Sequence, residues 1–128
     1  MQRNKVVLVV LLVLAAALVQ GCMLAVVGAG AAGTVAYIRG DLEAVESKNL
    51  DAVYAATKKA VDELGYKVTK DAKDALEAEI VARDAGDNKV TIILKKTAAD
   101  ATKVSIRVGT FGDETKSQLI YGKIRDNL

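Results

Sequence analysis

The chain has 128 residues, with 18 basic and 16 acidic residues, one Cys and no His, Trp or Pro. The absence of His and the single Cys exclude Ser-His-Asp and Cys-His catalysis, and the common zinc and iron sites built on these residues. We therefore predict no enzyme activity, no cofactor and no metal site.

The first 21 residues have the organisation of an export signal. Arg3 and Lys5 precede an unbroken apolar run of 14 residues, from Val6 to Val19. As a helix this run would be about 21 Å long, which is shorter than the ~30 Å hydrocarbon core of a membrane. A basic start, an apolar run of this length and a small residue before the cleavage point are typical of a secretory signal peptide, which we predict over residues 1–21.

The predicted cleavage point lies between Gly21 and Cys22. Leu18 to Cys22 reads LVQGC and resembles the bacterial lipobox, which places an aliphatic residue and a small residue before an obligatory Cys. The resemblance implies diacylglycerol on the Cys22 thiol and a third acyl chain on the new amine. Because an unpaired thiol is a liability in an oxidising compartment, lipidation explains this lone Cys better than a buried free thiol does. Two or more acyl chains hold a protein stably on a membrane.

Cleavage would also change the charge of the protein. Of the 18 basic residues, Arg3 and Lys5 leave with the signal peptide, so 16 basic and 16 acidic residues remain. We therefore expect no basic footprint for nucleic acid, and only weak overall attraction to anionic lipid head groups.

Residues 23–36 are uncharged and rich in Gly and Ala, and they contain a possible nucleotide motif. Gly28, Gly30 and Gly33 form G-x-G-x-x-G, the phosphate-binding turn of dinucleotide folds. The first strand of such a fold would begin one residue from the lipidated Cys, where it could not be buried inside a parallel sheet. The fold also needs an acidic residue about 20 positions later, at the end of a second strand; Asp51 has the spacing, but the residues before it do not form an apolar strand. We expect no nucleotide binding and interpret residues 22–36 as the lipidated Cys and a flexible tether. Small residues four apart also allow a helix that packs in the membrane.

The remaining residues, 37–128, are sufficient for one small domain. Residues 37–46 predict an edge strand in which Gly40 is a weak point. Asn49 is predicted to cap a helix that Gly65 ends in the left-handed conformation. The apolar stripe of this helix comprises Leu50, Val53, Tyr54, Thr57, Val61 and Leu64.

Alternation of apolar and polar residues then predicts four strands, near residues 66–69, 76–83, 89–95 and 103–108. Such alternation indicates an antiparallel sheet that is covered on one side. Asp113 is predicted to cap a final helix with Ser117, Ile120, Ile124 and Leu128 on one face. The predicted fold is α+β, an antiparallel sheet of about five strands with two helices packed on one face, in the order β-α-β-β-β-β-α. The polar face is predicted to carry Arg39, Glu43, Glu77, Glu79, Lys89, Thr91, Lys95, Lys103, Ser105 and Arg107.

Two features of the domain were considered as sites. Carboxylate pairs occur at Glu77/Glu79, Asp71/Asp74 and Asp113/Glu114. Glu77 and Glu79 are interpreted as solvated side chains that pair with lysines of neighbouring strands. The turn from strand to helix could instead hold an anion on backbone N–H groups at the start of the helix; it comprises Gly109, Thr110, Phe111, Gly112 and Asp113. Asp113 would compete for those donors, so the alternative is an ordinary turn in which Phe111, the only Phe, closes the core.

Several segments together resemble one family. The lipobox, the Gly/Ala tract, YIRGDLEA, LDAVYAATKKAVDELGYKV and KVSIRVGTFGDE are similar to a group of small bacterial lipoproteins known as domain of unknown function 3568. The resemblance covers nearly all of the chain, and IRVGTFGD is its most distinctive part. It implies a bacterial envelope protein and no particular activity.

Two functions remain open at this point. The first is a non-catalytic envelope lipoprotein that binds another protein or supports the cell surface. The second is a module that binds a small ligand or lipid in a pocket between sheet and helices, which requires a cavity of a few hundred Å³. The expected partners are membrane lipid, through acylated Cys22, and an envelope protein, with no nucleic acid or nucleotide.

The residue after the lipidated Cys predicts the destination. An Asp at that position commonly retains lipoproteins in the inner membrane of bacteria with two membranes, whereas this chain has Met23. We therefore expect the outer membrane, with the domain facing the periplasm. The alternative is the outer leaflet of the inner membrane.

Overall fold

The structure, a computed structural model, describes residues 2–13 and 35–128. These belong to two units, residues 1–34 and Val35–Leu128. Residues 2–13 form a helix whose side chains are exposed and mostly apolar. In the described ranges, no helix has both the length and the apolar character needed to span a membrane.

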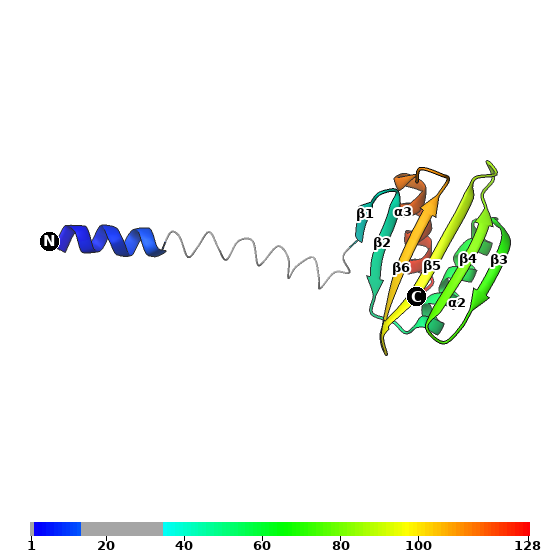
Figure 1. Cartoon of the computed structure of the whole chain (residues 1–128), viewed down its shortest axis with the longest axis horizontal. Helices are drawn as coiled ribbons and strands as arrows, with labels where there is room; N and C mark the ends of the chain where they lie inside the picture. Colours follow the sequence, from blue (N-terminus) through cyan, green and yellow to red (C-terminus); the bar gives the residue numbers. More distant parts are fainter. Residues whose placement is uncertain (1, 14–34) are drawn as a thin grey trace. The chain divides into compact units, whose positions relative to one another are not determined.

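The second unit is built on one sheet of six antiparallel strands, in the spatial order β1-β2-β6-β5-β4-β3 (Figure 1). The strands are β1 (Val35–Ile38), β2 (Asp41–Glu46), β3 (Lys67–Lys73), β4 (Glu77–Arg83), β5 (Lys89–Ala98) and β6 (Ala101–Val108). Two helices complete the unit, α2 (Leu50–Glu63) after β2 and α3 (Glu114–Asp126) at the end.

The prediction of about five strands and two helices, in the order β-α-β-β-β-β-α, is wrong. With the helix over residues 2–13, the described chain has three helices and six strands, in the order α-β-β-α-β-β-β-β-α. The extra strand arises because Arg39 and Gly40 turn the chain back. Their φ angles are 52° and 90°, and two consecutive positive φ values are typical of the tightest hairpin turns. Gly40 therefore separates two strands, where we had expected it to weaken a single one.

The ends of α2 confirm the local predictions. The Asn49 side chain accepts a hydrogen bond from the N–H of Ala52 at 2.8 Å, and Gly65 has a φ of 71°. The buried face differs from the prediction: Ala56 and Ala60 are also buried, whereas Tyr54 and Leu64 are only partly buried. The small side chains of the two alanines allow the helix to lie close to the sheet.

The final helix, α3, is confirmed in its cap and in most of its buried face. The Asp113 carboxylate accepts from the N–H of Lys116 at 3.0 Å. Ser117, Ile120 and Ile124 are buried as predicted. The prediction for Leu128 is wrong, since the helix ends at Asp126 and Leu128 remains 38% exposed.

The core lies between one face of the sheet and the two helices, which Figure 1 shows on the same side. Alternate residues of β2, β4, β5 and β6 point into it; they are Leu42, Ala44, Ala78, Ile80, Ala82, Val90, Ile92, Leu94, Val104, Ile106 and Val108. All core residues fall between Leu42 and Ile124. The unit Val35–Leu128 thus contains a complete core of its own.

Candidate functional site

The face of the sheet opposite the helices carries the polar residues that the alternation predicted. They occupy the positions between the buried ones; they are Glu43, Glu77, Glu79, Lys89, Thr91, Lys95, Lys103, Ser105 and Arg107. Arg39 is the exception, since it lies in the β1–β2 turn. We call this surface the outer face. Neither α2 nor α3 covers it, because both pack against the core residues of the other face.

Part of the outer face has balanced charges. The Lys103 ammonium lies 3.1 Å from the carboxylate of Glu43, and Lys70 pairs with Glu79. Glu77 stands directly opposite Lys95 in the register of β4 and β5. These are the solvated cross-strand arrangements predicted for Glu77 and Glu79. Exposed pairs of this kind contribute up to about 1 kcal/mol each.

The opposite end of the outer face is different, because three cations follow one another across neighbouring strands. The register places Arg83 of β4 directly opposite Lys67 of β3 and also directly opposite Lys89 of β5. Among the described residues, none of these three side chains has a carboxylate within 4.0 Å. Like charges directly opposite each other destabilise a sheet. We call Lys67, Arg83 and Lys89 the basic row.

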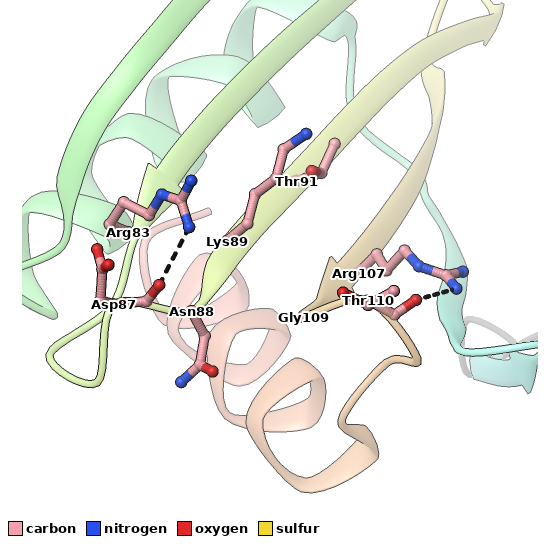
Figure 2. Close-up of a pocket in the computed structure, with 8 residues that line it drawn as sticks. All are labelled: Arg83, Asp87, Asn88, Lys89, Thr91, Arg107, Gly109 and Thr110. Atoms are coloured by element: carbon pink, nitrogen blue, oxygen red, sulfur yellow. Dashed lines mark hydrogen bonds between the residues drawn. The ribbon is translucent and has the colours of Figure 1, made fainter.

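A cleft of about 480 Å³ opens beside the basic row (Figure 2). Figure 2 shows Lys89 and Thr91 of β5 between Arg83 on one side and Arg107 on the other. Three cations therefore line the cleft together with one carboxylate, that of Asp87. The full lining is Arg83, Asp87, Asn88, Lys89, Thr91, Arg107, Gly109 and Thr110. We call it the basic cleft.

Arg107 is held in place by contacts on two turns. Its guanidinium donates to the Asp41 carboxylate at 3.1 Å and to the carbonyl of Arg39 at 3.1 Å. It also donates to the carbonyl of Thr110 at 2.7 Å (Figure 2). Hydrogen bonds from a charged donor are stronger than neutral ones. Arg107 therefore joins the β1–β2 turn to the loop after β6 at the edge of the basic cleft.

The β4–β5 turn forms the other wall, and Asp84 organises it. The Asp84 carboxylate accepts from the N–H groups of Gly86 and Asn88, both at 2.9 Å, and from the Lys116 ammonium at 3.1 Å. Its side chain is only 5% exposed. Hydrogen bonds from the side chain and backbone of Asn88, with a further contribution from Lys116, lower the pKa of Asp84 to about 2. Within the turn so formed, the carbonyl of Asp87 accepts from Arg83 at 3.1 Å.

The predicted candidate loop contributes only in part. Gly109 and Thr110 line the basic cleft, whereas Asp113 occupies the start of α3 as its cap. The prediction that Phe111 closes the core is wrong, because its side chain is 90% exposed. At this end of the sheet, the backbone of Phe111 packs directly against Gly40. The two are so close that a Cβ on Gly40 would lie 2.5 Å from the Phe111 carbonyl oxygen. Since this close backbone contact fills the site, the Phe111 side chain projects outward.

The other carboxylates that we considered have structural partners. Asp71 accepts from the Tyr54 hydroxyl at 2.6 Å and lies 2.9 Å from Lys58, and these hydrogen bonds lower its pKa. Asp74 accepts from the N–H groups of Leu76 and Glu77, which lowers its pKa in the β3–β4 turn. Within residues 2–13 and 35–128, no group of three or more Asp, Glu, Cys or His could hold a metal ion.

Sequence reasoning did not single out Lys67, Arg83, Asp87 or Asn88. A signal for part of the site was present, since Arg83 and Lys89 flank the short turn that contains AGDN. Residues that flank a hairpin turn symmetrically stand opposite each other, so a pair of like charges could have been recognised there. Lys67 could not, because its place opposite Arg83 depends on the pairing of β3.

Predictions for several earlier residues lie outside the described part of the chain. They are the cleavage point at Gly21, the lipidation of Cys22, most of the tether at 22–36, and the motif at Gly28, Gly30 and Gly33.

Comparison with protein families gives one match. No curated protein matches the chain. A family model described as "Protein of unknown function (DUF3568)" matches residues 5–127. The match includes the whole sheet, both of its helices and the loop that borders the basic cleft. Since it covers nearly the entire sequence, the chain belongs to this family of uncharacterised proteins.

Proposed function

We propose that this protein is a lipid-anchored lipoprotein of the bacterial envelope whose folded domain is a non-catalytic interaction module. The observation that carries the proposal is the outer face of the sheet. Six strands are covered by helices on one side only, and the other side presents ordered charges and the basic cleft. An uncovered, charged surface of this kind suits binding to a partner better than it suits catalysis, for which His and Cys are lacking in the domain.

The anchor part of the proposal is supported by the order of residues at the start of the chain. A basic start, an apolar run, Gly21 and Cys22 follow one another as in exported lipoproteins. Met23 in place of Asp supports delivery to the outer membrane with the domain in the periplasm. The inner membrane is the alternative destination.

The second candidate, a ligand pocket between sheet and helices, has less support. Ile80, Ile92 and Ile106 of the sheet are at most 1% exposed on the side that faces the helices. The alanines of α2 bring the helix close to these residues. The basic cleft opens on the outer face, away from that layer.

The anchor is tested by growing cells with a fatty-acid analogue and comparing the protein with its Cys22→Ser variant. We expect the natural chain to be labelled and processed, and the variant to remain an unlabelled precursor. Gly30→Ala is the matched control, because it changes the tether and keeps Cys22, and it should be labelled normally. Label that persists in Cys22→Ser would contradict the proposal.

The destination is tested by density fractionation of membranes from the same cells. The natural chain should accompany outer-membrane markers, and Met23→Asp should shift it toward the inner membrane. Recovery of the natural chain with inner-membrane markers would contradict the outer-membrane assignment and leave the anchor itself intact.

A further inference from the structure

The charges of the chain after Cys22 sum to zero, yet the domain distributes them unevenly. The basic row places three cations side by side on β3, β4 and β5. Elsewhere on the outer face, the like-charged neighbours Lys95 and Lys103 each have a carboxylate beside them: Glu77 stands opposite Lys95 in the register, and Glu43 lies 3.1 Å from Lys103. Such compensation is lacking in the basic row as far as the structure describes the chain. An external anion would supply it.

Apolar side chains are exposed at the same end of the sheet. Phe111 is 90% exposed, and Ile38, which precedes the β1–β2 turn, is 51% exposed on the outer face. Both belong to the two turns whose backbones meet at Gly40 and Gly112. A large exposed aromatic side chain on a closely packed turn is a recurrent feature of contact surfaces.

One cation of the cleft is connected to the segment that carries the aromatic residue. Arg107 lines the basic cleft and donates to the carbonyl of Thr110, the residue directly before Phe111. It also donates to the carbonyl of Arg39 in the neighbouring turn. Phe111 is therefore linked to the cleft through Thr110, whose carbonyl accepts the 2.7 Å hydrogen bond from Arg107.

We propose that this end of the outer face docks onto an anionic lipid surface. Arg83 and Lys89 of the basic cleft take head-group phosphates, Arg107 holds the edge of the cleft through its pairing with Asp41, and Phe111 enters the interfacial layer beside them. Cations near an anionic leaflet are attracted to it, and aromatic side chains favour the membrane interface. The pairing of phosphate-binding cations with an exposed Phe favours a lipid surface over a soluble phosphate, which would leave Phe111 without a role.

The inference rests on the proposed anchor, which would keep the leaflet within reach. Only residues 23–34 separate Cys22 from the first residue of β1, and a chain of that length spans at most about 40 Å when fully extended. Acyl chains alone limit only the distance between the domain and the membrane. Docking would also fix which face of the domain is turned toward the membrane.

The test uses residues 35–128, which carry the complete core and lack both the apolar helix and Cys22. Co-sedimentation is measured with vesicles of phosphatidylcholine alone and with vesicles that also contain phosphatidylglycerol. We expect binding to the mixed vesicles, weakened by added salt, and little binding to phosphatidylcholine alone.

Two variants and two matched controls locate the contact. Lys89→Gln should weaken binding to the mixed vesicles by about fivefold, and Phe111→Ser by about tenfold. Lys95→Gln removes the same charge from the same face of β5, but outside the basic cleft and opposite Glu77, and should leave binding unchanged. Leu119→Ser, which alters an exposed residue of α3, should also leave it unchanged. Circular dichroism of each variant checks that the fold is retained.

Three results would overturn the inference. The first is equal binding to both kinds of vesicle. The second is an equal loss of vesicle binding for Lys89→Gln and Lys95→Gln. The third is a change in the NMR signals of Arg83 and Thr110 on adding inorganic phosphate or a phosphopeptide, without any vesicle binding. The last would identify a soluble phosphorylated ligand. Because residues 35–128 lack Cys22, these results are independent of acylation. If residues 35–128 do not bind the mixed vesicles while Cys22 of the full chain is labelled, the docking is refuted and the anchor remains supported.

Discussion

At the scale of single residues, Asp84 holds together the turn that forms one wall of the basic cleft. Its carboxylate accepts hydrogen bonds from Gly86, Asn88 and Lys116, and so it links the β4–β5 turn to α3. That turn supplies Asp87, whose carbonyl orients Arg83 in the basic cleft. The shape of the cleft therefore depends on a carboxylate that has little exposed surface and does not itself line the cleft.

The lowered pKa of Asp84 predicts how stability depends on pH. Its pKa is about 2 in the folded domain, against an ordinary value of 3.8, so ionised Asp84 favours folding above about pH 4. This contribution is lost as the pH falls from about 4 to 2. Asp84→Asn should reduce the free energy of unfolding at pH 7 by about 1–3 kcal/mol and weaken its pH dependence between pH 4 and 2, where Asp71 and Asp74 still contribute.

Urea unfolding followed by circular dichroism at several pH values measures both effects. Asp62→Asn, on the exposed side of α2, is the control and should preserve the natural pH dependence. An Asp84→Asn variant with the natural stability and pH profile would show that the carboxylate does not hold the turn.

At the scale of elements, two turns from distant parts of the chain meet at one end of the sheet. Gly40 of the β1–β2 turn and Gly112 before α3 have φ angles of 90° and 85°. A side chain on Gly112 would meet the backbone of Gly40, and a side chain on Gly40 would meet the backbone carbonyl of Phe111. This contact holds Phe111 outside and brings the loop after β6 against the hairpin of β1 and β2.

Gly112→Ala should therefore be strongly destabilising. The added Cβ would overlap the carbonyl of Gly40 and lie 2.6 Å from the Tyr37 hydroxyl oxygen, at a φ that disfavours Ala. We expect a loss of about 3 kcal/mol in the free energy of unfolding. Gly122→Ala is the matched control: nothing lies within 4 Å of its Cβ position inside α3, so it should stabilise the domain by up to about 1 kcal/mol. Equal effects of the two substitutions in denaturant unfolding would contradict this account.

At the scale of the whole molecule, Val35–Leu128 is a unit with a complete core. The buried residues of the hydrophobic core lie between Leu42 and Ile124, and β1 completes the sheet along the outer edge of β2. Folding of this unit should therefore not require residues 1–34.

Residues 35–128 should fold alone, with cooperative thermal unfolding and dispersed NMR amide signals. A shorter version that begins at Asp41 lacks β1 and the turn that contacts Gly112, so we expect a lower midpoint of thermal unfolding. If residues 35–128 were unfolded while the full chain was folded, the first unit would be required for stability, contrary to this prediction.

The sequence by itself determined the features that depend on neighbouring residues. Asn49 and Asp113 cap their helices, Gly65 ends α2, and alternation in β4, β5 and β6 separates buried from polar positions. Each of these is decided within a few residues of the chain, by a hydrogen bond to the nearest free N–H or by the period of the strand. For that reason the polar face could be predicted from the sequence except at Arg39, which lies in a turn.

Only the tertiary structure decided how these elements meet. The side-chain position of Phe111 depends on Gly40, 71 positions earlier in the chain. The basic row depends on the register of β3 against β4, which no local pattern specifies. The net charge of zero after Cys22 likewise gave no sign of a positive cleft, because a sum over residues carries no information about which of them become neighbours. Long-range backbone contact and strand register determine those neighbours, and with them the candidate site.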